Sequence, residues 1–244
     1  MTGLGTTFLI TRRELSTYLR SMTGYVIAAI LLLVDGLLFN IFAIGGDEKL
    51  SVVVLGEFFF YTSGLTLIAS VFISMRLVAE ERQTGTLVLL TSSPVLDEQI
   101  VAGKFLSGFL FLAMVLGLSV FMPLLILVNG KISFGHLAAG YLGLLLLGSA
   151  AMAIGTLGSA LARTQVLAAI FSGCMVTAMV LAWMLVRVTE RPFSDVFASL
   201  AIHGKHFQPF QLGSIHLRDV VYYLMVTMVA LFAAVRVMEA RRWR

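Results

Sequence analysis

The stretch LAAGYLGLLLLGSAAMAIGTLGSA, residues 137–160, contains no charged side chain. A helix needs about 20 consecutive apolar residues to cross the hydrocarbon core of a membrane, so this stretch is long enough to span it. Five further apolar runs occupy residues 23–44, 52–73, 100–128, 166–186 and 220–237. The sequence therefore predicts an all-α, polytopic membrane protein with six transmembrane helices.

The composition supports this fold class and excludes others. Of the 244 residues, 59% are hydrophobic and 12% are charged, against roughly 25% charged residues in a soluble globular domain. The net charge is only +4 and the bases are dispersed, which argues against nucleic acid as a partner. The single cysteine, Cys174, excludes an intrachain disulfide. We interpret residues 1–244 as one transmembrane domain that contacts the lipid bilayer and lacks a nucleotide-binding domain.

The first twenty residues combine apolar and basic side chains at helical spacing. Phe8 and Leu15 belong to the periodic apolar positions, and Arg12 and Arg13 lie between them. This pattern is typical of an amphipathic helix that lies in the membrane interface. Eleven Lys and Arg residues fall on the side of the two termini and six on the opposite side. Because cytoplasmic segments retain positive charge, we expect both termini in the cytoplasm and the chain in the bacterial inner membrane.

The segment between the second and third runs, RLVAEERQTGT at residues 76–86, differs from its surroundings. Charged Glu80, Glu81 and Arg82 are embedded among apolar residues, which predicts a short amphipathic helix at the inner membrane surface. Gly85, before Thr86, can accommodate a bend. Such a helix could be pushed by a soluble motor, and a merely solvated loop is the alternative reading.

The sequence offers no catalytic constellation. No Gly-x-x-x-x-Gly-Lys-Ser/Thr motif is present, so any ATP and Mg²⁺ must be bound by another chain, and we expect no cofactor here. The predicted spans contain neither a histidine nor a pair of aspartates, which argues against an intramembrane hydrolase. His203 and His206 could share a metal, but their spacing without a third ligand is a weak signal. We therefore expect a non-catalytic subunit that binds no metal.

An acidic residue lies in the middle of the first run. A charge at membrane depth is costly, so Asp35 should face protein or water rather than lipid. It is a candidate, with the nearby Asn40, for a transport path or a dimer seam. The alternative is a structural carboxylate that is satisfied by Asn40, by a hydroxyl group or by a neighbouring helix.

Four motifs distributed over nearly the whole chain resemble a known family. They are Arg12-Arg13-Glu14-Leu15; Ala79-Glu80-Glu81-Arg82 with Gly85-Thr86; Ser93-Pro94-Val95 leading to Gly103-Lys104; and His206-Phe207 through Gly213 to residues 218–223. The chain resembles the permeases of type-2 ABC exporters, particularly the branch of gliding-motility and nitrous-oxide-reductase maturation permeases.

The resemblance implies several partners and roles. The permease would pair with a second copy or a similar permease, and each half would bind an ABC nucleotide-binding subunit. Residues 80–86 would dock into a cleft of that ATPase, with the N-terminal helix close by. Residues 188–216, including His206, Phe207 and Gly213, would form short re-entrant helices in the outer leaflet. The first and fifth spans would meet their counterparts across the dimer.

The sequence and the resemblance are compatible with two functions. The first is an exporter permease whose cargo could be a lipid, a polysaccharide, a peptide, or a copper- or sulfur-related species. The second is the membrane subunit of an ATP-driven motility or envelope-assembly complex, which transmits mechanical work without transporting a solute. The polar and charged segment 188–216 would suit a periplasmic partner of such a complex.

Overall fold

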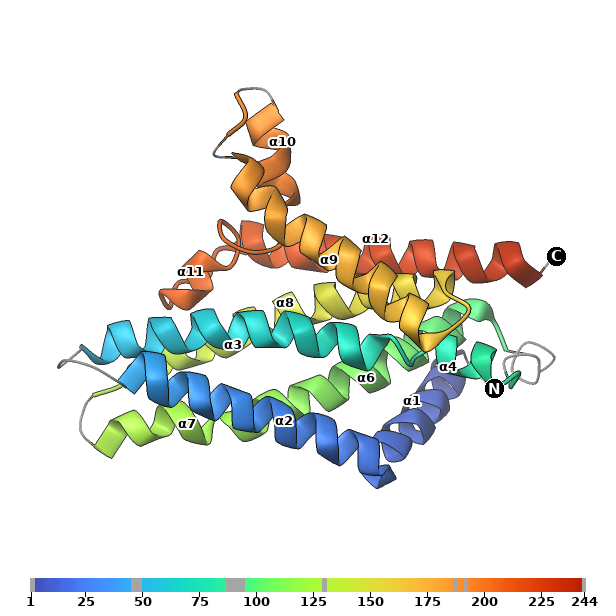
Figure 1. The fold of residues 1–244 in the computed structure, drawn as a ribbon, viewed down its shortest axis with the longest axis horizontal. Coiled ribbons are helices and arrows are strands. Elements are labelled where there is room, and N and C mark those ends of the chain that lie inside the picture. Colours follow the sequence, from blue (N-terminus) through green and yellow to red (C-terminus); the bar gives the residue numbers. More distant parts are fainter. Residues whose placement is uncertain are drawn as a thin grey trace.

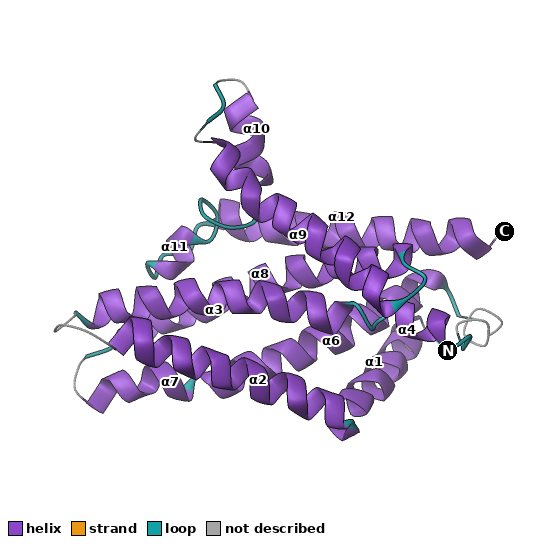
Figure 2. Cartoon of the chain, in the orientation of Figure 1, coloured by secondary structure: helices purple, strands orange, loops and turns teal. Residues whose placement is uncertain are grey.

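The computed structural model describes residues 3–44, 50–86, 95–128, 131–186, 188–190 and 193–242. Within these ranges the chain forms helices and no strand (Figure 2). Six helices are long and apolar enough to cross a membrane. The prediction of an all-α, polytopic membrane protein is confirmed.

The spanning helices begin within three residues of the predicted runs. They are α2 (Met22–Leu38, continued by the π-helical turn η1, Phe39–Ile44), α3 (Ser51–Ser74), α6 (Asp97–Ser119), α8 (Phe134–Leu161), α9 (Gln165–Val186) and α12 (Leu217–Arg242). The other helices are α1 (Gly3–Arg20), α4 (Ala79–Gln83), α7 (Phe121–Leu124), the 3-10 turn η2 (Leu125–Val128), α10 (Phe193–Leu200) and α11 (Gln208–Gln211).

Helix α8 is the core of the bundle. Of its most apolar window 72% is buried, against 17% in each of α2 and α9. Small side chains allow this burial, because they let neighbouring helices approach closely. A Cβ atom built on Gly155 would lie 1.9 Å from the Ser74 Oγ of α3. The regularly spaced small residues Ala151, Gly155 and Ser159 are all buried, so they serve helix packing.

The third span is interrupted near its end. Helix α6 ends at Ser119, and a separate short helix, α7, begins at Phe121. Pro123 explains the break, because its ring clashes with the carbonyl group four residues earlier, which belongs to Ser119. Ser93 and Pro94, whose residue types suit an N-cap followed by a proline in the first helical position, lie outside the described residues, and α6 begins at Asp97.

Both described ends of the chain lie at one end of the bundle, together with α1 and α4 (Figure 1). We call this the terminal end, and the opposite end the far end. Helix α1 packs against α6 and turns sharply into α2. The turn is fixed by Ser21, the N-cap of α2, whose Oγ accepts a hydrogen bond from the Gly24 N–H at 3.1 Å.

Candidate functional site

Helix α4, the predicted coupling helix, is present and is anchored at its start by a residue of another helix. Its own N-cap residue, Val78, makes no side-chain capping bond. The Ser159 Oγ of α8 instead accepts hydrogen bonds from the Val78 and Ala79 N–H groups at 3.1 and 3.0 Å. The same hydroxyl donates to the Met75 carbonyl at 3.1 Å. Because the first N–H groups of a helix lack intrahelical acceptors, Ser159 caps α4 from outside.

The other end of α4 is attached to the junction of α8 and α9. The Arg82 guanidinium donates to the carbonyls of Ala160, at 2.9 Å, and of Ala162. These carbonyls lie at the C-terminus of α8, where the helix dipole favours a cation. The Gln165 N–H, at the start of α9, donates to the Gln83 Oε1 at 3.3 Å. Helix α4 therefore contacts two spans through polar bonds.

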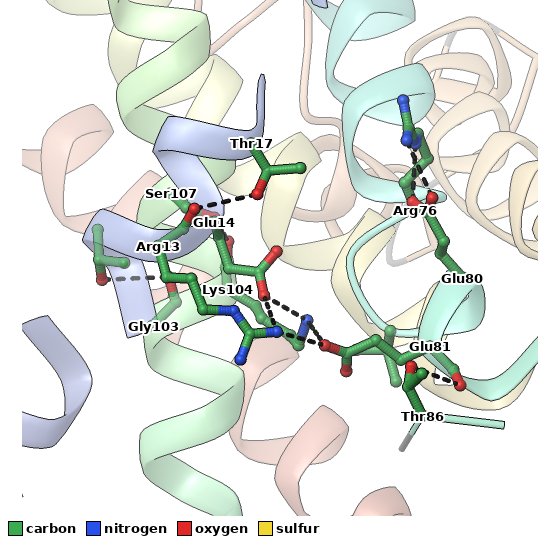
Figure 3. A network of polar contacts seen from close by, with 12 residues as sticks. Arg13, Glu14, Thr17, Arg76, Glu80, Glu81, Thr86, Gly103, Lys104 and Ser107 are labelled. Atoms are coloured by element: carbon green, nitrogen blue, oxygen red, sulfur yellow. Dashed lines mark hydrogen bonds and ion pairs between the residues drawn. The ribbon is translucent and has the colours of Figure 1, made fainter. Parts of the chain in front are cut away.

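A compact charge network joins α4 to α1 and α6 (Figure 3). The Lys104 Nζ of α6 lies 2.8 Å from the Glu81 Oε1 and 3.3 Å from the Glu14 Oε1. Arg13 lies 3.7 Å from Glu14 and 4.0 Å from Glu81. The Lys104 side chain is only 2% exposed. Two cations and two anions balance, which offsets part of the cost of removing them from water.

The remaining charged residue of α4 forms a separate pair on the other side of the helix. Glu80 accepts two hydrogen bonds from Arg76, at 2.9 and 3.0 Å, and points away from the Glu81 network (Figure 3). After α4 the chain bends at Gly85, whose φ of 75° favours glycine. The Thr86 Oγ1 lies 2.9 Å from the Thr84 Oγ1. Residues 83–86 are exposed, and we call this surface at the end of α4 the free rim.

The four residues singled out in α1 have different surroundings. Arg13 joins the charge network, and Leu15 is half-buried against the apolar core. Phe8 and Arg12 are exposed and are not brought to α4. Tyr18 anchors the helix, since its hydroxyl donates to the Ile73 carbonyl at 3.3 Å. Burial raises the pKa of Tyr18 well above its ordinary value, so the hydroxyl remains a neutral donor.

Asp35 lies inside the bundle and is 4% exposed. The Thr62 Oγ1 of α3 donates to its Oδ1 at 2.7 Å. Asn40 lies in η1 and is exposed, so the structure does not bring these two residues together. A hydroxyl group of a neighbouring helix, rather than Asn40, bonds the carboxyl group.

The segment of residues 201–216, which we call the cap, packs on the parts of α3, α8 and α12 that lie toward the far end of the bundle. Phe207 is fully buried, and the His206 Nδ1 lies 2.8 Å from the Asp219 Oδ1 of α12. Gly213 has a φ of 81° and touches His136 of α8. The His136 Nε2 donates to the Gln211 carbonyl at 2.8 Å. The cap contains α11, and α10 precedes it, which agrees with two short helices in the predicted re-entrant region.

His203 and His206 are both engaged inside the protein. The His203 Nε2 lies 2.8 Å from the Ser63 Oγ, and burial lowers the pKa of His203. Among the described residues no group of three His, Cys, Asp or Glu side chains could hold a metal. The described residues therefore supply no third ligand for a metal site at His203 and His206.

Sequence reasoning missed several partners in these contacts. Lys104 lies within the third predicted run, and a cation at that depth signals a carboxylate partner. The spacing of Ser159 with Ala151 and Gly155 indicates only a small packing residue, although its hydroxyl caps α4. Glu14 and Asp219 gave no separate signal, because their partners, Lys104 and His206, come from other segments of the chain.

The arrangement defines a class: a polytopic helical membrane protein with a non-spanning helix bound to the ends of its spans. The ABC-2 family transporter protein model matches residues 9–190, which is most of the chain and includes part of α1, all of α4 and five of the six spans. The chain belongs to this family. It is a membrane permease subunit of an ABC transporter, and the family implies an ABC ATPase partner and typically a permease dimer. A search of curated proteins found no match.

Proposed function

We propose that this chain is the permease of an exporter in the bacterial inner membrane, with both termini cytoplasmic. A separate nucleotide-binding subunit would hold ATP and Mg²⁺, and a second permease, identical or similar, would complete the pathway. The motifs given above favour the branch of gliding-motility and nitrous-oxide-reductase maturation permeases. The observation that carries the proposal is the polar attachment of α4, a helix that does not span the membrane, to the four helices α1, α6, α8 and α9.

This attachment offers a route for mechanical coupling. The exposed residues 83–86 would bind the ATPase, whose closure on ATP would displace α4. Arg82 and Ser159 would pass this displacement to α8. Glu81 would pass it through Lys104 to α6 and α1. Because packed helices move as rigid bodies between discrete arrangements, a shift at α4 would rearrange the bundle.

Helices α2 and α9 are the candidates for the dimer surface. They are the least buried spans, at 17% of their apolar windows. Large apolar side chains, including Leu33 and Leu37 of α2 and Phe171 of α9, are exposed. These faces fit a second permease whose first and fifth spans meet them, as the family resemblance implies.

A hollow between α3 and α9 favours transport over purely mechanical work. One cavity of about 670 Å³ lies beside the cap, and a second of about 340 Å³ adjoins it through Gly64, Leu67 and Val180. Together they extend along α3 from Phe60 to Phe72. At about 1.5 Å per residue this is about 18 Å, more than half the membrane core. A cargo could therefore follow α3 over much of its passage.

One observation favours the alternative, a subunit that moves an envelope complex without transporting a solute. The end of α9 and α10 project beyond the bundle (Figure 1), and Val188, Phe193 and Leu200 are exposed there. This arm could contact a periplasmic partner. The hollow along α3 has no role in that mechanism, so we place the exporter first.

The test is chemical crosslinking from the free rim of α4. Thr84→Cys would be placed in a Cys174→Ser background, because Thr84 is exposed whereas the Glu81 side chain is only 12% exposed. The tagged chain would be purified from membranes in mild detergent. We expect Thr84→Cys to capture an ATP-binding subunit.

The matched control is Ser214→Cys, an exposed position in the cap at the far side. It should capture no ATPase, because it would lie across the membrane. Capture from Ser214 instead of Thr84 would reverse the proposed orientation. Capture from neither position, with the chain intact and dimeric, would contradict ATP-driven export.

A further inference from the structure

A small cavity lies beside Asp35 in the interior of the bundle. It is formed by residues of α2, α3 and α6, and its volume is about 20 Å³. A cavity of this measure can hold about one water molecule, provided that polar partners are present. Its polar lining comes from Asp35, Thr62, Thr66 and Ser119, and the other lining residues are apolar.

The hydroxyl protons around this cavity are committed to other acceptors. Thr62 donates to Asp35, and the Thr66 Oγ1 donates to the Thr62 carbonyl at 2.7 Å. The Ser119 Oγ donates to the Leu116 carbonyl at 2.8 Å and lies 3.0 Å from the Tyr141 hydroxyl. Each hydroxyl therefore offers the cavity a lone pair rather than a proton. The cavity is a cluster of acceptors that lacks a donor.

No described residue forms an ion pair with Asp35. Of the described residues that line the cavity, it is the only one with an ionisable side chain. A further titratable group, Tyr141 of α8, is reached through Ser119. An isolated carboxylate at membrane depth is strongly disfavoured, and acceptors around it add repulsion.

We propose that the Asp35 cavity is a proton-binding site within the membrane-spanning bundle. One proton on the Asp35 Oδ2 converts the carboxylate to a neutral acid and supplies the donor that the surrounding lone pairs lack. No other group changes its protonation. Because the cavity joins α2, α3 and α6, the bound proton stabilises this packing of the three helices, and its release favours their separation.

The site is positioned to influence the transport path. Helix α3 presents Thr62 and Thr66 to this cavity and presents Gly64 and Leu67 to the hollow against α9. A change in the packing of α3 on α2 therefore also changes the hollow. The permease cycle would thus depend on pH as well as on ATP.

Infrared spectroscopy of the full chain in lipid nanodiscs tests the proposal directly. A protonated carboxyl group has a C=O stretching band separate from that of a carboxylate. We expect one such band at neutral pH, and we expect Asp35→Asn to remove it. The amide group of this variant would still place a donor in the cavity, so the variant should fold. The control is Glu98→Gln, which removes an exposed acid of α6 and should leave the band unchanged.

A second variant keeps the test decisive if Asp35→Asn fails to fold. Thr62→Val removes the bond to the Asp35 Oδ1 at nearly constant shape and should shift the same band. Absence of the band in the unmodified chain at neutral pH would overturn the proposal. A band that neither variant changes would also overturn it. A band that disappears when sodium chloride replaces potassium chloride would overturn it as well, because it would indicate that Asp35 binds a metal cation rather than a proton. The spectrum requires no ATPase, so its result is separate from the crosslinking result.

Discussion

Two segments that do not span the membrane, α4 at the terminal end and the cap of residues 201–216 on the far side, are held by different forces. Helix α4 is attached by hydrogen bonds and by a charge network whose outer member, Arg13, has a side chain 70% exposed. The cap is attached by the fully buried rings of Phe207 and Phe210 and by polar bonds that lie inside the bundle, among them the buried His206–Asp219 pair and the bond of His136 to the Gln211 carbonyl.

This difference has a mechanical consequence. At the terminal end, contacts of exposed side chains such as Arg13 can be exchanged for contacts with water or with a partner protein at small net cost. The buried contacts of Lys104 and Ser159 lie behind them and connect α4 to the spans. Close-packed apolar contacts shift only with a rearrangement of their neighbours. The terminal end is therefore suited to receive a displacement from a partner, and the cap is suited to hold the far side of the bundle rigid.

The largest effect should come from reversing a charge in the terminal network. Glu81→Lys would leave Lys104 buried beside two further cations, Arg13 and the new lysine. Breaking a buried ion pair by removing one partner costs about 3–5 kcal/mol. We expect the chain to insert, because the spans are unchanged, but to lose stability in thermal unfolding and to uncouple the ATPase of the purified complex.

The control for this variant is Glu98→Lys, the same change at an exposed position of α6. It should leave both measurements unchanged. The double variant Glu81→Lys with Lys104→Glu restores opposite charges and should recover part of the stability. Wild-type coupling in Glu81→Lys would show that the network transmits nothing.

A smaller loss should follow from disturbing the packing under the cap. A Cβ atom on Gly143 would lie 2.5 Å from the Phe210 Cβ, so Gly143→Leu overpacks this contact. Overpacking a well-packed core costs about 1–3 kcal/mol. We expect lower thermal stability and faster proteolysis of the cap, with ATPase binding retained at the terminal end.

The matched control is Gly117→Leu in α6, because no atom lies within 4 Å of a Cβ built there. If both variants behaved alike, the effect would reflect glycine replacement in general rather than the cap. If Gly143→Leu abolished ATPase binding, the two ends of the bundle would not be mechanically distinct.

The smallest effect concerns pH. Burial lowers the pKa of His203 below its ordinary 6.5, so the unfolded chain binds a proton more readily than the folded chain does. The stabilisation is fully present above pH 6.5 and is lost as the pH falls through the lowered pKa. His203→Gln should flatten thermal stability over this range, whereas His216→Gln, at an exposed position, should not. An unchanged pH dependence in His203→Gln would assign the acid sensitivity elsewhere.

Much of the fold, but less of the site, could be predicted from the sequence. The six spans and the short helix around Glu80 to Arg82 were predicted, because each is encoded in a local pattern of apolar and charged residues. The different partners of the two glutamates of α4 were not predicted. Glu80 pairs locally with Arg76, whereas Glu81 binds Lys104 of another helix. Two adjacent glutamates of one sequence block thus differ only through their direction around the helix.

The sequence by itself determined that this chain is a six-span membrane protein with a charged segment between two spans. It could do so because the free energy of transfer into a membrane depends on the composition of each segment alone. Only the tertiary structure decided that Thr62 bonds Asp35 and that Ser159 caps α4. Such contacts join residues far apart in the chain, and they depend on how helices of similar composition are rotated and packed against one another.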